Sequence, residues 1–284
     1  ALAVINVGPH LGIVLGLVIG GLVAPSMGWR SAFLLAGGPG LIFGLVFWLT
    51  VREPIRGSAD VGQSAPSGGS PNFVARVVTL WSDAAYRNLI LAGCLFAFVG
   101  IALGTWMPSF MARSYGMALS SVGPLLGLVV LITGPLSTIL GGLIGDRLSR
   151  RGEGRSLLLP IAGGLLGLPL MCAAILTTNL PLTLILYGLG TMSLGLHIGP
   201  IFGLIQNVAP PHLRGLAAAF LVMFNSLVAS GLGPLVVGAA SDALEPRYGA
   251  EALRLSMALS TLAFVPAIAF TALALRALRR AAPR

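Results

Sequence analysis

The sequence alternates between long apolar runs and short polar connections. Eight runs contain no Asp, Glu, Lys or Arg: approximately 1–24, 31–51, 88–111, 122–145, 156–178, 181–207, 215–240 and 255–275. Each is long enough to cross a hydrocarbon layer about 30 Å thick at about 1.5 Å of rise per residue. None alternates apolar and polar residues as the strands of a membrane β-barrel do. The pattern predicts an all-α, polytopic membrane protein with eight transmembrane helices in this chain.

A polar segment interrupts the pattern between the second and third runs. Its first half is rich in Ser, Gly and Pro, which predicts a flexible linker. After Asn72 apolar residues return at helical spacing, which predicts a short helix on the membrane face. We expect two helices that end one bundle, then a cytoplasmic linker, then a six-helix bundle, at residues 1–51, 52–87 and 88–284. Because Ala1 already lies inside an apolar run, we expect a fragment of a longer protein.

The basic residues predict the orientation of the helices. All 17 are Arg, and if the runs cross a bilayer alternately, thirteen of them share one side with the C-terminus. The side opposite holds only Arg30, Arg113, Arg247 and Arg254. Arg-rich loops stay in the cytoplasm, so we expect a cytoplasmic C-terminus. The lack of Lys beside abundant Ala, Gly and Arg indicates a GC-rich bacterial genome, and hence the inner membrane of the cell.

The composition excludes a soluble fold and several kinds of partner. Hydrophobic residues make up 56% of the chain, charged residues 9%, and the mean hydropathy is +0.95. An average globular domain has about 25% charged residues. The net charge of +9 is spread over separate loops, so the expected partner is the lipid bilayer and not a nucleic acid. No CxxC or HExxH pattern occurs, and we predict neither a metal nor a cofactor.

Residues 141–151, GGLIGDRLSRR, predict a conformational latch at the end of the fourth run. Its members are two glycines and four charged residues, namely Gly141, Gly145, Asp146, Arg147, Arg150 and Arg151. Glycines one turn apart let a neighbouring helix approach to backbone contact. We expect Asp146 to pair with the arginines and to cap the following helix. Such charges can pin two bundles together in one state and part in another.

Polar residues inside the runs are the candidates for substrate binding, because each costs several kcal/mol if it faces lipid unpaired. Counted along the spans, four lie near the midplane: His10, Thr133, His197 and Asn225. Apolar walls are predicted from five further residues: Phe98, Trp106, Met107, Phe202 and Phe224. The alternative is that the histidines bond neighbouring helices and the aromatics are packing. A histidine here could also carry a coupling proton.

The latch sequence resembles the G-x-x-x-D-R-x-x-R-R loop motif of the major facilitator superfamily, in the copy between helices eight and nine. Three other stretches, 28–41, 85–117 and 199–219, resemble spinster-type members of that superfamily. The resemblance implies a twelve-helix, two-bundle transporter of which helices five to twelve are present. It also implies alternating access, proton coupling and a small amphipathic cargo of the lysolipid or sphingoid type.

Other functions remain as alternatives. Organic-anion transport needs a fixed positive charge at mid-depth; no Arg of this chain lies there, but an Arg on a helix outside this chain could supply it. Drug export needs only an apolar cavity. An intramembrane enzyme needs a nucleophile and a base, or carboxylates, within reach, and the eight runs contain no Asp or Glu. A scaffold or receptor has no dedicated extramembrane domain to support it. We therefore expect a transporter and not an enzyme.

Overall fold

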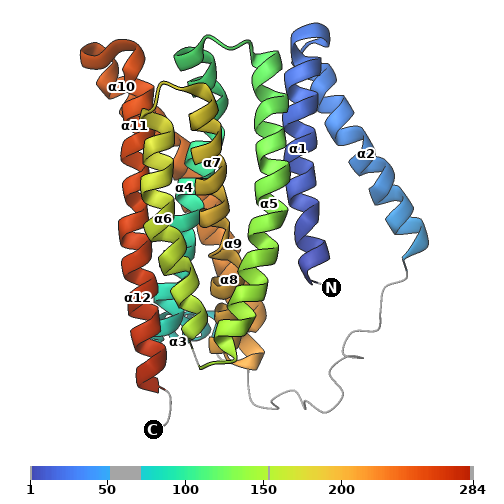
Figure 1. The fold of residues 1–284 in the computed structure, drawn as a ribbon. Helices are drawn as coiled ribbons and strands as arrows, with labels where there is room; N and C mark the ends of the chain where they lie inside the picture. Colours follow the sequence, from blue (N-terminus) through green and yellow to red (C-terminus); the bar gives the residue numbers. More distant parts are fainter. Residues whose placement is uncertain (1, 52–71, 153, 282–284) are drawn as a thin grey trace.

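The computed structural model describes residues 2–51, 72–152 and 154–281, with side chains described from residue 12 to residue 280. The described residues form helices joined by short connections (Figure 1). The linker predicted after residue 51 falls largely outside the described residues, as does the side chain of His10.

The predicted all-α class and the eight spans are confirmed. The spanning helices are α1 (Leu2–Met27), α2 (Trp29–Thr50), α4 (Ala84–Tyr115), α5 (Leu119–Ser149), α6 (Leu158–Leu176), α7 with α8 (Leu180–Gly195 and Ile198–Val208), α9 with η3 and α10 (Arg214–Phe224, Asn225–Leu232 and Gly233–Tyr248), and α11 with α12 (Ala252–Ser260 and Phe264–Ala281). Six helical stretches are long and apolar enough to cross a membrane. The last, Pro211–Arg280, turns back near Gly249 and therefore supplies two spans, and α1, with 26 residues, supplies another.

Local signals set several helix ends. The side chain of Asp83 accepts a hydrogen bond of 2.8 Å from the backbone N–H of Tyr86, which caps the start of α4. Asn179 caps α7 in the same way, through the N–H of Leu182 at 3.1 Å. α4 ends at Gly116, whose φ of 64° lies in the left-handed region that glycine adopts without strain.

The core is centred on α4, which packs against α8, α10, α11 and α12. Phe96, Phe110 and Phe264 are among its largest fully buried side chains. The hydroxyl of Tyr86 donates to the carbonyl of Ala217 at 3.2 Å and so joins α4 to α9. The helices α4 to α12 thus share one continuous apolar core.

The short helix α3 (Phe73–Ser82) lies at the same end of the molecule as the C-terminus (Figure 1). Its Leu80 is buried, and the ring of Trp81 stacks on Phe224 with 5.3 Å between ring centroids. We call this end of the molecule the α3 end, and the end with the α1–α2 and α10–α11 turns the opposite end.

A seam of glycines joins α1 to α5 near the opposite end. A Cβ on Gly21 would lie 3.2 Å from the Cα of Gly123 and from the ring of Pro124. A Cβ on Gly123 would overlap the carbonyl oxygen of Leu17. The two helices can be this close because Gly21 and Gly123, at the point of contact, have no side chains. Towards the N-terminus of α1 the ribbons of α1 and α5 diverge (Figure 1).

Candidate functional site

A cavity of about 380 Å³ lies among α1, α4, α5, α7, α8 and the start of η3. This volume falls within the range of about 300–1,000 Å³ that is usual for small-molecule sites. Four of the nine predicted substrate residues line it: Thr133, His197, Phe202 and Asn225. They come from different helices. Counting along the spans placed them at a similar depth in the membrane, and the tertiary structure brings them together around one cavity.

His197 lies at the break between α7 and α8. Pro200 has no N–H, so the carbonyl of Leu196 lacks its usual partner in the helix, and the chain turns there. The ring of His197 is only 6% exposed and stacks on Phe96 with 4.9 Å between centroids and 19° between planes. Its Nδ1 lies 2.6 Å from the carbonyl oxygen of Leu194.

That contact decides the tautomer of the ring. A carbonyl oxygen can only accept, so Nδ1 carries the hydrogen and donates it to Leu194. In the neutral ring Nε2 is then an acceptor. No hydrogen bond to Nε2 comes from the described part of the chain.

Hydroxyl groups from α5 and α7 meet at the wall of the cavity. Thr133 donates to the carbonyl of Val129 at 2.8 Å, and Thr191 donates to the carbonyl of Gly188 at 2.9 Å. The hydroxyl of Thr191 is also directed to the hydroxyl oxygen of Thr133, at 3.3 Å, and this contact joins α7 to α5. The approach is close because Gly195 of α7 lies directly against Ser137 of α5.

Asn225 begins η3, a π-helical segment of eight residues between α9 and α10. π-helical turns occur within α-helices mostly at functional positions. The Oδ1 atom of Asn225 is buried and has no hydrogen bond among the described residues. An amide placed in this way is costly unless a ligand or another group pairs with it.

The structure places the other four described residues of the predicted site away from this cavity. The indole of Trp106 donates to the carbonyl of Pro234 at 2.9 Å, and Met107 is fully buried in the core. The backbone of Phe98 packs against Gly233, and Phe224 stacks on Trp81. Counting along a span gives depth but no rotation about the helix axis, so residues at the right depth can face other helices.

Sequence reasoning missed most of the other lining residues, among them Phe96, Tyr187 and Thr191. On α4 the face towards the cavity is formed by Phe96, Gly100 and Gly104, which recur every four residues. That spacing could have been recognised in the sequence, since two glycines on one helical face leave room for another helix or a ligand to approach closely. Tyr187 and Thr191 are also four residues apart, on α7, and are polar residues within a predicted span.

The predicted latch lies at the α3 end. Gly141 and Gly145 are buried, and a Cβ at each would lie 3.4 Å from the Cα of Leu196 and 3.3 Å from the ring of Pro200, respectively. The two glycines therefore face α8 at close range. α5 continues through the motif to Ser149, so Asp146 lies in its last turns and does not cap the next helix as we expected.

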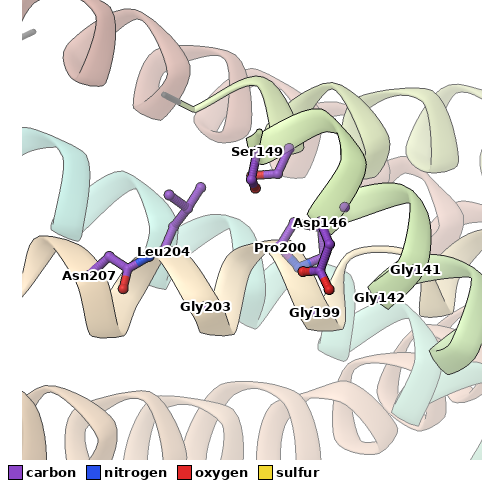
Figure 2. Close-up of a pocket in the computed structure, with 11 residues that line it drawn as sticks. Gly141, Gly142, Asp146, Ser149, Gly199, Pro200, Gly203, Leu204 and Asn207 are labelled. Atoms are coloured by element: carbon purple, nitrogen blue, oxygen red, sulfur yellow. The ribbon is translucent and has the colours of Figure 1, made fainter. Parts of the chain in front are cut away.

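The predicted ion pairs of the latch are absent from this state. Among the described residues, no ion pair within 4.0 Å joins Asp146 to Arg147, Arg150 or Arg151. All four side chains are exposed. Figure 2 shows Asp146 and Ser149 on α5 facing α8 across a pocket of about 260 Å³, which Gly199, Gly203 and other residues of α8 line. The carboxylate is thus available to a partner that the described residues do not supply.

Comparison with known proteins identifies the family. The profile of the Major Facilitator Superfamily matches residues 1–234. An MFS-type efflux pump of Mycolicibacterium smegmatis is 31% identical over 260 residues, which is 89% of this chain and 57% of that protein. Protein spinster homolog 1 of Homo sapiens is 30% identical over 277 residues, or 89% of this chain and 52% of that protein. A sphingosine-1-phosphate transporter of Danio rerio is 26% identical over 256 residues.

A solved structure gives the same result. A bacterial homolog of the human lysosomal transporter Spinster, in an inward-facing and unoccupied conformation, superposes with a TM-score of 0.73 and 25% identity. The match covers 89% of this chain and 60% of that one. The chain thus spans a little over half the length of the curated relatives it matches. Both the sequence motifs and the arrangement of the helices show that the chain belongs to the major facilitator superfamily, in its spinster-like branch.

Proposed function

We propose that this chain supplies helices of a secondary transporter that moves a small amphipathic molecule across a cell membrane by alternating access. The cavity among α1, α4, α5, α7, α8 and η3 carries the proposal, because it combines unpaired polar atoms with an apolar wall. His197, Thr133 and Asn225 would contact a polar head, and Phe202, Ile101 and Phe96 an apolar chain or ring. Membership of a transporter family supports this function over an intramembrane enzyme.

The α1–α5 seam supports alternating access. The seam holds the two helices together near the opposite end, while their ribbons diverge towards the α3 end (Figure 1). We propose that the α3 end faces the cytoplasm, since it carries most of the arginines. The described conformation would then be closed to the outside, and opening would require the seam to part.

The cargo is proposed from the names of two relatives, and proton coupling from the resemblance to the superfamily. One relative is named a sphingosine-1-phosphate transporter and another an efflux pump. A lysolipid or sphingoid-type cargo fits a cavity with one polar wall, and a lipophilic drug is the second candidate, favoured by the efflux-pump relative. The organic-anion alternative is less well supported, because no described residue that lines the cavity carries a positive charge. We propose protons as the coupling ion.

Transport into proteoliposomes tests the proposal. The full-length protein is reconstituted, and uptake of a fluorescent lysolipid is measured with and without a pH gradient. We expect His197→Ala and Asn225→Ala each to slow uptake by about tenfold, because each removes a polar partner worth about 1 kcal/mol or more. Leu189→Ala and Val222→Ala are the matched controls, since both side chains are exposed on α7 and α9.

Unchanged uptake in both cavity variants would contradict the assignment of this cavity. If uptake by the unmodified protein does not respond to a pH gradient, proton coupling is contradicted, but the assignment of the cavity is not. Thermal unfolding and gel filtration of each variant show whether it is folded. A competition series with a lysolipid, a dicarboxylate and a lipophilic cation identifies the class of cargo.

A further inference from the structure

We propose that the polar wall of this cavity is built to accept hydrogen bonds, so that its ligand presents N–H or O–H donors, as a primary amine or a hydroxylated head does, and not a head whose polar atoms are anionic oxygens alone. The proposal rests on the transport function above and names the substrate class of the same cavity. It depends on which N–H and O–H groups of the wall already donate to other groups of the protein.

His197 is the first acceptor. Its Nδ1–H is committed to the carbonyl of Leu194 at 2.6 Å, and its ring is held flat against Phe96. The lone pair of the neutral ring is therefore on Nε2. The side chain is more than nine-tenths buried and is part of the cavity lining.

The hydroxyl groups of the wall already donate their hydrogens within the protein. Thr133 donates to the carbonyl of Val129 and Ser137 to that of Gly134, at 2.8 Å each, and the hydrogen of Thr191 is directed to the carbonyl of Gly188 at 2.9 Å and to the oxygen of Thr133 at 3.3 Å. A hydroxyl has one hydrogen and two lone pairs. What these three groups have left to offer a ligand is therefore an acceptor in each case.

Asn225 adds another polar atom without a partner. Its Oδ1 is buried and accepts no hydrogen bond from the described residues. Against these acceptors, the wall has two side chains with hydrogens to donate, the amide of Asn225 and the hydroxyl of Tyr187. Acceptors thus outnumber donors on the described wall.

The charges of the lining residues also bear on the head group of the ligand. None of the described residues that line the cavity is Arg, Lys, Asp or Glu. Either charged head would meet no counter-ion on the described wall, but an anionic head would in addition face lone pairs, which disfavours it further in a buried site. A head with several N–H or O–H groups instead satisfies Nε2 of His197, Oδ1 of Asn225 and the hydroxyl oxygens together.

Three amphiphiles with the same twelve-carbon chain separate donor number from charge. They are dodecylamine, dodecyltrimethylammonium and dodecyl phosphate, each titrated below its micelle concentration into the full-length protein in nanodiscs. Both cations carry the same charge, but only the primary amine has N–H donors. We expect the amine to bind about tenfold or more tightly than either of the others, because each hydrogen bond it forms is worth about 1 kcal/mol.

Two variants locate the effect. His197→Phe keeps an aromatic ring against Phe96 but removes the acceptor, and Asn225→Leu removes the amide at similar size. In the double variant the preference for the amine over dodecyltrimethylammonium should fall to less than about threefold. His212→Phe is the control, because this exposed histidine lies in η2 (Pro211–Leu213), outside the cavity.

The proposal is overturned if dodecyl phosphate binds as tightly as the amine, or if the preference for the amine survives in the double variant. If lysolipid uptake still depends on His197 and Asn225, neither result contradicts the proposed transport function. If none of the three amphiphiles binds and lysolipid uptake is also independent of these residues, the proposed function fails as well.

Discussion

The α1–α2 pair and the block from α4 to α12 are both made of apolar helices but differ in how they are packed. α4 has fifteen buried residues, whereas none of the 22 residues of α2, all of them described, is buried. In α2 the side chains of Phe43 and Trp48 are 73% and 77% exposed. The comparison shows that hydropathy identifies a membrane helix without telling whether protein or lipid covers it. The block has its own core, and the pair is held to it chiefly by the glycine seam.

The sharpest test of this difference replaces one phenylalanine in each region. Phe264→Ala removes a side chain that is fully buried against Phe96 and Gly167 and should lower the free energy of unfolding by about 3–5 kcal/mol. Phe43→Ala should change it by less than about 0.5 kcal/mol. Thermal unfolding in detergent measures both. Equal losses would show that α2 is packed against protein in the full-length molecule.

The seam is the next test. Gly123→Ala puts a methyl group against the carbonyl of Leu17, so we expect a loss of about 1–3 kcal/mol or a displacement of α1. Gly20→Ala is the matched control, because a Cβ there meets no described atom within 4 Å. Cross-linking between cysteines introduced on α1 and on α5 reports the separation of the two helices. A variant as stable and as readily cross-linked as the control would rule out a tight seam.

A smaller effect is expected inside the block. Trp106→Phe keeps an aromatic ring but loses the hydrogen bond to the carbonyl of Pro234, which should cost about 1 kcal/mol. Lysolipid uptake should stay within about twofold of the unmodified protein, because Trp106 lies outside the cavity lining. A large loss of uptake without a loss of stability would return Trp106 to the substrate site.

The smallest effect on stability is expected at the latch. Asp146 is exposed and forms no ion pair with the described arginines, so Asp146→Asn should change the free energy of unfolding by less than about 0.5 kcal/mol. If the latch pairs only in another state of the transport cycle, uptake should nevertheless fall. Normal uptake in this variant would argue against a latch, and Arg113→Gln, at the opposite end, is the control.

The sequence by itself determined the class of protein, the eight spans and the short list of polar residues at mid-depth. Periodic apolar runs and the Gly and Asp-Arg motif are local features, so they can be read without knowing what each helix touches. Thr133, His197 and Asn225 were found because a polar residue inside an apolar run is costly wherever it faces. The same reasoning could not separate Phe202, which lines the cavity, from Met107, which is buried in the core.

Only the tertiary structure decided the rest, because it depends on rotation about helix axes and on long-range contacts. The tautomer of His197 follows from a single carbonyl at a helix break, and the π-helical turn at Asn225 has no sequence signal of its own. The closeness of Gly123 to Leu17 exists only once α1 and α5 pack. Depth along a span is set by chain geometry, but the direction in which a side chain points is set by its neighbours.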